Sequence, residues 1–271
     1  MTQHLLLFDF DETYYKHHTT SEDIDDLKQM EDTLSNIEMS NNATTAILTG
    51  SSITSVLNKM NSINMEYKPK HVFSDLSSKM FTFQKGEYVE SEKYKEMVLA
   101  TPFKKEDILE IVSTIATKYQ CDVKPQREFA HDATLYDFYY FSQGDNAIDL
   151  KILNDMTKYA KSKNYTMKFN KCNPLAGDPE DAYDVNFIPN NAGKLFATKF
   201  LMEVYDIPLE NIIGFGDSGN DYEFLAFLKN SFVMCNSTDE MMRNEFTMSK
   251  YPYYKGIHYH ISKYWAEHHN K

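Results

Sequence analysis

Short apolar segments and segments with helical periodicity alternate in the first eighty residues and again after residue 190. The strand-like segments lie at residues 5–8, 44–48, 70–74, 212–216 and 231–234. Runs of this length and character are typical of strands buried on both faces. Between them, apolar residues recur at helical spacing, for example in 24–37, 53–60 and 196–204. Strands that alternate with helices predict an α/β fold with a parallel sheet and right-handed crossovers.

The alternation stops in the middle of the chain. A hairpin is predicted at 81–89, helices around 108–119 and 152–159, and strands at 135–141, 165–170 and 183–188. Strands and helices without steady alternation predict an antiparallel sheet covered on one face. We therefore expect an inserted α+β domain at 82–187, with a core domain made of 1–81 and 188–271.

Two carboxylates follow the first strand, at Asp9 and Asp11. Such a pair is costly to bury without partners, so we expect it at the exposed carboxyl end of the strand, where open α/β sheets place ligands. The pair could serve as a nucleophile with an acid/base group, as a divalent-metal site, or as both. A strand that ends in a solvated acidic turn would show the same local pattern.

Three later stretches of the chain carry further polar residues that belong with Asp9 and Asp11. None of these stretches is specific by itself. Thr49 and Gly50 end the second strand, Lys194 opens a helix, and Asp217 and Asp221 lie in a glycine-rich loop after the strand at 212–216. In this order, the stretches resemble the four motifs of the haloacid dehalogenase superfamily of phosphohydrolases. These are Asp-x-Asp-x-Thr, a strand-terminal Thr or Ser, a Lys, and Gly-Asp-x-x-x-Asp. The motifs span nearly the whole chain, and Glu12 departs from them because many members have glycine there.

The resemblance implies a Rossmann-like core with an inserted cap of type C2, as in the Cof-like branch of this superfamily. It implies that Asp9 is the nucleophile, which splits phosphoryl transfer into two steps, and that Asp11 is the general acid and base. The implied cofactor is Mg²⁺, which prefers oxygen ligands. Its implied ligands are Asp9, the backbone carbonyl of Asp11, Asp217 and Asp221. The residues expected to bind or orient the phosphate are Thr49, Gly50, Lys194 and Asn220.

The composition of the chain limits the classes of molecule that the protein is expected to bind and the compartment in which it is expected to work. The formal net charge of −12 argues against nucleic acid as a main partner, whereas a small phosphorylated substrate needs only a local lysine or metal. The three cysteines are widely separated, which favours a reducing cytoplasm. The amino terminus leaves no room for a signal peptide before the first strand, and no apolar run has the length of a membrane span. Nothing in the pattern indicates the oligomeric state.

One stretch of the expected cap is unusually polar. Residues 170–184 contain two prolines, a glycine, two asparagines and four acids, which predicts an ordered loop between two strands. A long turn would have the same composition. If caps of this superfamily face the leaving group, the loop suits sugar hydroxyls or a sugar ammonium. The candidate substrate-binding residues of the loop are Lys171, Asn173, Asp178 and Asp181.

The expected activity is therefore Mg²⁺-dependent hydrolysis of a small sugar or amino-sugar phosphate through an aspartyl phosphate. A sugar phosphomutase of the same superfamily is an alternative, because nothing in the motifs excludes it. A catalytically silent, phosphate-binding regulatory protein is a second alternative. The presence of both Asp9 and Asp11 weighs against it, because a binder does not need both carboxylates.

Overall fold

The computed structural model describes residues 4–40, 42–126, 133–172, 174 and 178–269. The chain divides into two compact units, which are described here one at a time. The first unit comprises Met1–Ser91 and Lys194–Lys271, and the second comprises Glu92–Gly193. The sequence predicts an insertion at 82–187, and the second unit begins ten residues and ends six residues further along the chain.

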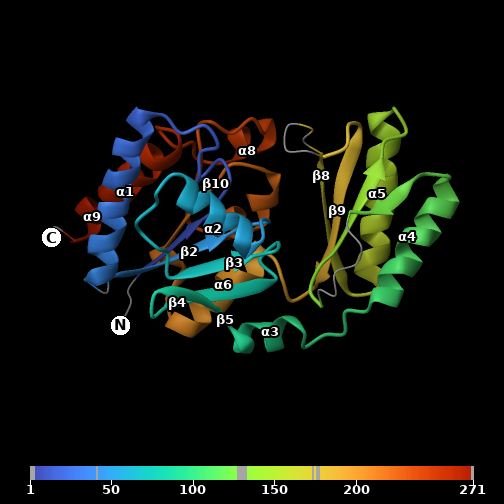
Figure 1. Cartoon of the computed structure of the whole chain (residues 1–271), viewed down its shortest axis with the longest axis horizontal. Helices are drawn as coiled ribbons and strands as arrows, with labels where there is room; N and C mark the ends of the chain where they lie inside the picture. The colour runs from blue at the N-terminus through green and yellow to red at the C-terminus, as the bar shows by residue number, and fades with distance from the viewer. Residues whose placement is uncertain (1–3, 41, 127–132, 173, 175–177, 270–271) are drawn as a thin grey trace. The chain divides into compact units, whose positions relative to one another are not determined.

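A seven-stranded sheet forms the centre of the first unit (Figure 1). Its order is β11-β10-β1-β2-β3-β4-β5. The first five of these are parallel, and β4 and β5 add to the edge as an antiparallel hairpin. The bounds are β1 (His4–Phe8), β2 (Ala43–Leu48), β3 (His71–Ser74), β4 (Lys79–Gln84), β5 (Glu87–Glu90), β10 (Ile212–Gly216) and β11 (Asn230–Val233). The parallel α/β core predicted from the alternating pattern is confirmed.

Helices cover both faces of this sheet, which explains why β1 is apolar from Leu5 to Phe8. Leu6 and Phe8 pack into one core with residues of α1 (Ser21–Met39), α2 (Ile53–Ser62) and α9 (Tyr253–His269). Successive side chains of a strand point to opposite faces, so Leu7 faces the other side. Gly214 is its register partner, and a Cβ there would meet Leu228 and the side chains of α7 (Tyr222–Phe227). The remaining helical elements of the unit are α6 (Lys194–Tyr205), η2 (Leu209–Asn211), η3 (Gly219–Asp221) and α8 (Glu240–Glu245).

The second unit is a four-stranded antiparallel sheet with helices packed on one face (Figure 1). The strand order is β6-β7-β9-β8. Ile108 and Ile111 of one helix and Ile152 and Met156 of another pack against inward-facing strand residues such as Phe138. The bounds are α3 (Glu92–Val98), α4 (Lys105–Tyr119), β6 (Val123–Pro125), β7 (Tyr136–Phe141), α5 (Asn146–Ser162), β8 (Tyr165–Lys171) and β9 (Ala182–Pro189).

The hairpin of β4 and β5, most of which the sequence analysis placed in the insertion, belongs to the sheet of the first unit. β4 pairs with β3 along four residues, from His71 with Thr82 to Ser74 with Lys79. The return boundary differs as well, because β9 runs to Pro189 and α6 begins only at Lys194. The described part of the chain contains no helix that is both long and apolar enough to cross a membrane.

Candidate active site

Asp9 follows β1 directly and lies at the carboxyl end of the parallel sheet. Its backbone N–H donates to the carbonyl of Phe215 on β10, at 2.9 Å, so the end of β1 is fixed against its neighbour. The residue is 5% exposed. Burial raises the pKa of the Asp9 carboxyl, and the nearby Asp221 raises it further, while Lys194 opposes both effects. A carboxylate in this position therefore requires a cation beside it.

Lys194 is that cation within the chain. It is the first residue of α6, is 8% exposed, and places Nζ 2.5 Å from Oδ1 of Asp9 and 2.5 Å from Oδ1 of Asp221. Burial alone would lower the pKa of Lys194, but Asp221 and Asp9 more than offset it and the pKa is raised. Nζ also donates to Oδ1 of Asn220, at 3.2 Å. The sequence-predicted Lys194 and Asn220 thus meet Asp9 in one charged cluster.

Asp221 is completely buried and organises the loop after β10. Its Oδ2 accepts from the backbone N–H groups of Asp217, at 3.0 Å, and Ser218, at 3.2 Å, while Oδ1 accepts from Lys194. Gly216 leaves the space that this carboxylate fills, because a Cβ there would lie 2.5 Å from Cγ of Asp221. Both oxygens of Asp221 therefore accept hydrogen bonds within the protein. This side chain is suited to orient Lys194 and the loop of Asp217 more than to bind a ligand directly.

Asp217 brings a third carboxylate to Asp9 and Asp221. Ligand atoms of the three residues lie within 4.8 Å of one another. Burial and the charges of Asp9 and Asp221 raise the pKa of Asp217 well above its usual range. Three carboxylates against the one ammonium of Lys194 leave an excess of negative charge that a divalent cation would offset. Carboxylate oxygens are also the ligands that Mg²⁺ prefers, so the residues present fit that ion.

Asp11 is held apart from this trio by its own partners. Its Oδ1 lies 2.5 Å from Nζ of Lys59 on α2, and its Oδ2 accepts from the hydroxyl of Ser51 at 2.9 Å. The ring of His17 is also close, with Nε2 3.6 Å from Oδ1. The structure therefore shows a carboxylate at the rim of the site that is 30% exposed, is hydrogen-bonded by Lys59 and Ser51, and has the ring of His17 beside it.

Thr49 and Gly50 lie where β2 ends, beside β1. The N–H of Thr49 donates to the carbonyl of Phe73 on β3, at 2.9 Å, and its hydroxyl accepts from the N–H of Ser51, at 3.0 Å. Thr49 is 1% exposed, whereas Gly50 is exposed. Both residues thus reach the same edge of the sheet as Asp9, which is the arrangement that the sequence predicted for a phosphate-binding turn.

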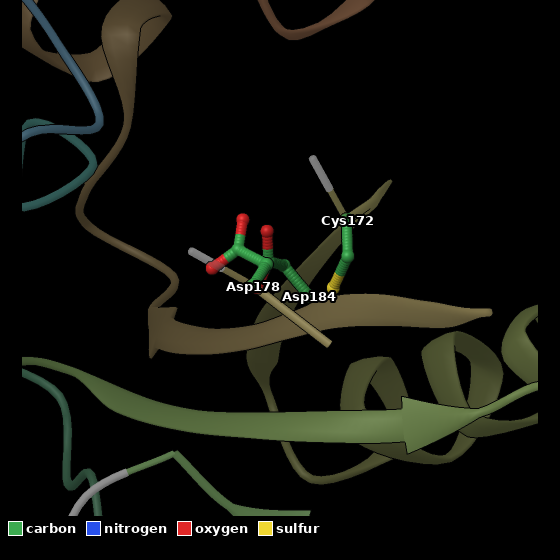
Figure 2. Close-up of side chains that lie close together, drawn as sticks. All are labelled: Cys172, Asp178 and Asp184. Carbon is green, nitrogen blue, oxygen red and sulfur yellow. The ribbon is translucent and has the colours of Figure 1, made fainter. Parts of the chain in front are cut away.

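The polar loop of the second unit is only partly described. Asn173 lies outside the described residues, whereas Lys171 ends β8, and Asp178 and Asp181 follow the undescribed segment. Figure 2 shows Asp178 beside two residues that the sequence analysis did not select, Cys172 and Asp184, and ligand atoms of the three lie within 4.8 Å of one another. Tyr139 donates its hydroxyl to Asp178, at 3.2 Å. Asp178 is therefore part of an ordered polar cluster, and Lys171 and Asp181 are not among its members.

Three partners of Asp11 and one partner of Glu12 were missed by the sequence analysis. The partners of Asp11 are Ser51, Lys59 and His17, and the partner of Glu12 is Tyr253. Lys59 reads as a surface lysine on α2, because only the folded chain brings it to Asp11. Tyr253 is more than 240 positions from Glu12, yet its hydroxyl donates to the Glu12 carboxylate at 2.6 Å. No local spacing signals such contacts, so they could be found only in the structure.

Comparison with known proteins places the chain in a family. The profile of the sucrose-6F-phosphate phosphohydrolase family matches residues 2–260. An uncharacterised hydrolase of Staphylococcus aureus (strain N315) is 51% identical over 264 residues, covering 97% of each chain. Kanosamine-6-phosphate phosphatase of Bacillus subtilis (strain 168) is 32% identical over 255 residues, covering 94% of this chain and 90% of the relative.

Solved structures agree with this placement. A haloacid dehalogenase-like hydrolase from Bacillus subtilis superposes with a TM-score of 0.78 at 31% identity, covering 98% of this chain and 92% of the other. The sucrose-phosphatase of Synechocystis sp. PCC6803, solved with sucrose and phosphate, gives 0.73 at 15% identity over 97% and 98% of the two chains, and so shares the fold. The motif residues gathered around Asp9 and Lys194 are those on which the sequence resemblance rested. The chain belongs to the sucrose-6F-phosphate phosphohydrolase family, and it is a phosphatase of the haloacid dehalogenase superfamily.

Proposed function

We propose that the protein is a Mg²⁺-dependent phosphomonoesterase that hydrolyses a small sugar or amino-sugar phosphate through an aspartyl phosphate on Asp9. The observation that carries this proposal is the buried cluster at the carboxyl ends of β1 and β10. There Lys194 bridges Asp9 and Asp221, and Asp217 lies within ligand distance of both. This cluster combines a nucleophile with a fixed positive charge and a carboxylate set that suits Mg²⁺.

Asp9 and Asp217 are the residues that would hold Mg²⁺, with Asp221 orienting the loop that carries Asp217. The backbone carbonyl of Asp11 is a further ligand by resemblance. When bound, the ion neutralises phosphoryl oxygens, so that an anionic nucleophile can approach a dianionic ester. Lys194 supplies a permanent positive charge at the same place, because its raised pKa keeps it protonated.

In the first step, a carboxylate oxygen of Asp9 attacks phosphorus and the bond from phosphorus to the ester oxygen breaks. Asp11 gives its proton to the departing oxygen, which leaves as the alcohol. The hydroxyl of Thr49 and the N–H groups of its turn donate to phosphoryl oxygens. Asn220 accepts from Lys194 and so keeps its ammonium directed at the cluster.

In the second step, a water molecule attacks phosphorus and the bond to Asp9 breaks. Asp11, now ionised, takes the proton of that water, and inorganic phosphate leaves. Each catalytic residue returns to its starting protonation state, so the cycle is balanced without a further reactant. A mutase would instead keep the phosphoryl group and return it to another position of the sugar.

Phosphate release separates these outcomes. The purified protein should release inorganic phosphate from members of a panel of sugar and amino-sugar phosphates when Mg²⁺ is present, and none when EDTA is added. Transfer between carbons of the same sugar, followed by ³¹P NMR, would show a mutase instead. Tight phosphate-ester binding without either reaction would show a regulatory binder.

The sugar assignment is supported by the relatives and by the second unit. The two named relatives act on a kanosamine phosphate and a sucrose phosphate, according to their names. Burial and the charge of Asp178 raise the pKa of Asp184, so these two carboxylates favour a neighbouring proton donor or cation. Sugar hydroxyls and a sugar ammonium are donors of this kind. We therefore propose the loop between β8 and β9 as the part that recognises the sugar.

Substituting Asp178 by alanine should lower kcat/KM for the preferred sugar phosphate by about 10-fold to 100-fold, because a hydrogen bond to a charged group contributes about 1.5–3 kcal/mol. The same substitution should change kcat/KM for p-nitrophenyl phosphate by less than about twofold, because that ester has no sugar hydroxyls. Asp122→Ala, at an exposed position of the same unit, is the matched control. Equal losses on both esters would mean that Asp178 supports the fold and does not recognise the sugar.

A further inference from the structure

Glu12 adopts a backbone conformation that disfavours a side chain. Its φ of 60° lies in the left-handed region, which glycine enters more readily than other residues. The turn itself is closed by the backbone, since the N–H of Glu12 donates to the carbonyl of Tyr15 at 2.9 Å. The Glu12 side chain is also 40% exposed, so it adds little to the core. Because this conformation has an energetic cost, we ask what the Glu12 side chain contacts.

Both carboxylate oxygens of Glu12 are engaged. Oε1 lies 2.6 Å from Nδ1 of His17, and Oε2 accepts from the hydroxyl of Tyr253 at 2.6 Å. Tyr253, the first residue of α9, also has a left-handed backbone, with a φ of 45°. The backbone carbonyl of Glu12 accepts from the amide of Asn236 at 2.8 Å. Three separate segments therefore fix this one glutamate.

The arrangement of His17 links Glu12 to Asp11. The hydrogen bond to Oε1 of Glu12 engages Nδ1, one of the two ring nitrogens of His17. The ring is thereby held with Nε2 directed to Asp11, 3.6 Å from its Oδ1. Tyr15 packs edge-on against the same ring, with centroids 5.2 Å apart. Glu12 thus sets the orientation of His17, and His17 lies against the carboxylate of the proposed acid and base.

Asp11 would otherwise have freedom to rotate, because it lies at the rim of the site. Lys59 and Ser51 approach it from α2 and from the loop after β2, and His17 approaches from its own loop. Proton transfer to a leaving oxygen depends on the direction of the carboxyl group, and small displacements of a catalytic group can cost much of the rate. A residue that holds one of these three partners therefore acts on the proton-transfer step.

We propose that Glu12 is a positioning residue for proton transfer, which acts with Tyr253 through His17 to direct the carboxyl group of Asp11 at the leaving oxygen. This inference rests on the hydrolytic function proposed above. It also accounts for the glutamate at a position where the related motifs have glycine. The effect of Glu12 should depend on the leaving group, because an alkoxide needs the proton of Asp11 whereas p-nitrophenolate departs without it.

The test compares the kcat/KM of simple alkyl phosphates with that of p-nitrophenyl phosphate. The parameter kcat/KM is used because it reports only the steps up to the departure of the leaving group. Glu12→Gly removes the carboxylate and relieves the backbone, so the variant should fold. We expect a loss of about 10-fold on the alkyl esters, within the range of general acid catalysis, and at most about twofold on the aryl ester. His17→Ala should show the same pattern. The double variant should lose about 10-fold and not 100-fold, because the two residues act as one unit.

Lys85→Gly is the matched control, since Lys85 has a φ of 53° in the exposed turn between β4 and β5. It relieves the same kind of strain and should leave both ester classes unchanged. Equal losses on alkyl and aryl esters in Glu12→Gly, or losses that multiply in the double variant, would overturn the positioning role. Failure of the wild-type protein to release phosphate from these esters and from the panel of sugar phosphates would overturn the proposed function itself.

Discussion

Replacing Asp9 by asparagine should abolish turnover and leave the fold intact. The amide is nearly the same size as the carboxylate, so it fits the buried position beside Lys194. It cannot form an acyl phosphate, however, and loss of a nucleophile removes most of the rate. We expect kcat to fall by about 10⁴-fold or more. The measurement is steady-state phosphate release by protein whose thermal unfolding is checked in parallel.

Asp25→Asn is the control for this experiment, because Asp25 is exposed on α1 and the change in charge is the same. That variant should keep wild-type activity. A folded Asp9→Asn protein that retained a substantial fraction of wild-type kcat would show that Asp9 is not the nucleophile.

Replacing Asp217 by alanine should weaken the binding of Mg²⁺ by a large factor. Its carboxylate is one of three whose ligand atoms lie within 4.8 Å, and its raised pKa shows that it is crowded by burial and by like charge. Because a ligand contributes at least as much as the residues that orient it, the Mg²⁺ concentration for half-maximal activity should rise on the order of 100-fold. Calorimetric titration of the protein with Mg²⁺ should show the same weakening without substrate.

Asp32→Ala, at an exposed position of α1, should leave the Mg²⁺ titration unchanged. If Asp217→Ala also left it unchanged, Asp217 would have no place in the metal site. Asp217 would then only support the fold of the loop that it shares with Asp221.

The core of the fold could be predicted from local patterns, whereas its edges could not. The strands at 5–8, 44–48 and 212–216 follow from short apolar runs, and the helical spacing at 24–37 lies within α1. The hairpin of β4 and β5 was assigned to the insertion, because an antiparallel pair breaks the alternation even when it extends the core sheet. The pattern of the carboxyl-terminal segment does not reveal the length or the packing of α9. This helix has 17 residues and packs against α1, and its Ile257 and Ile261 join the same core (Figure 1).

Some residues of the site could likewise be predicted from the sequence, whereas others could not. Asp9, Thr49, Lys194 and Asp217 lie at the ends of elements with recognisable composition, so their approach could be predicted from topology. The partners of Asp11 come from the loop that carries His17, from the turn after β2 and from the last turn of α2. None of them lies at a spacing that sequence patterns report. In the second unit, Asp149 is 2% exposed and is held by the hydroxyl of Tyr140 and the N–H of Gln143. Helical periodicity does not indicate that this carboxylate is buried, because its hydrogen-bond partners precede the helix.

The central claim is that Asp9 carries the phosphoryl group during the reaction. The most direct measurement uses Asp11→Asn, in which the first step proceeds with p-nitrophenyl phosphate but the residue that activates water is gone. We expect a burst of p-nitrophenolate with Mg²⁺ present, and acid-quenched protein that is heavier by one phosphoryl group. The label should map to the peptide that contains Asp9 and should be released by hydroxylamine, as for an acyl phosphate. A burst with no phosphoryl group on Asp9, or with the group on another residue, would contradict this account.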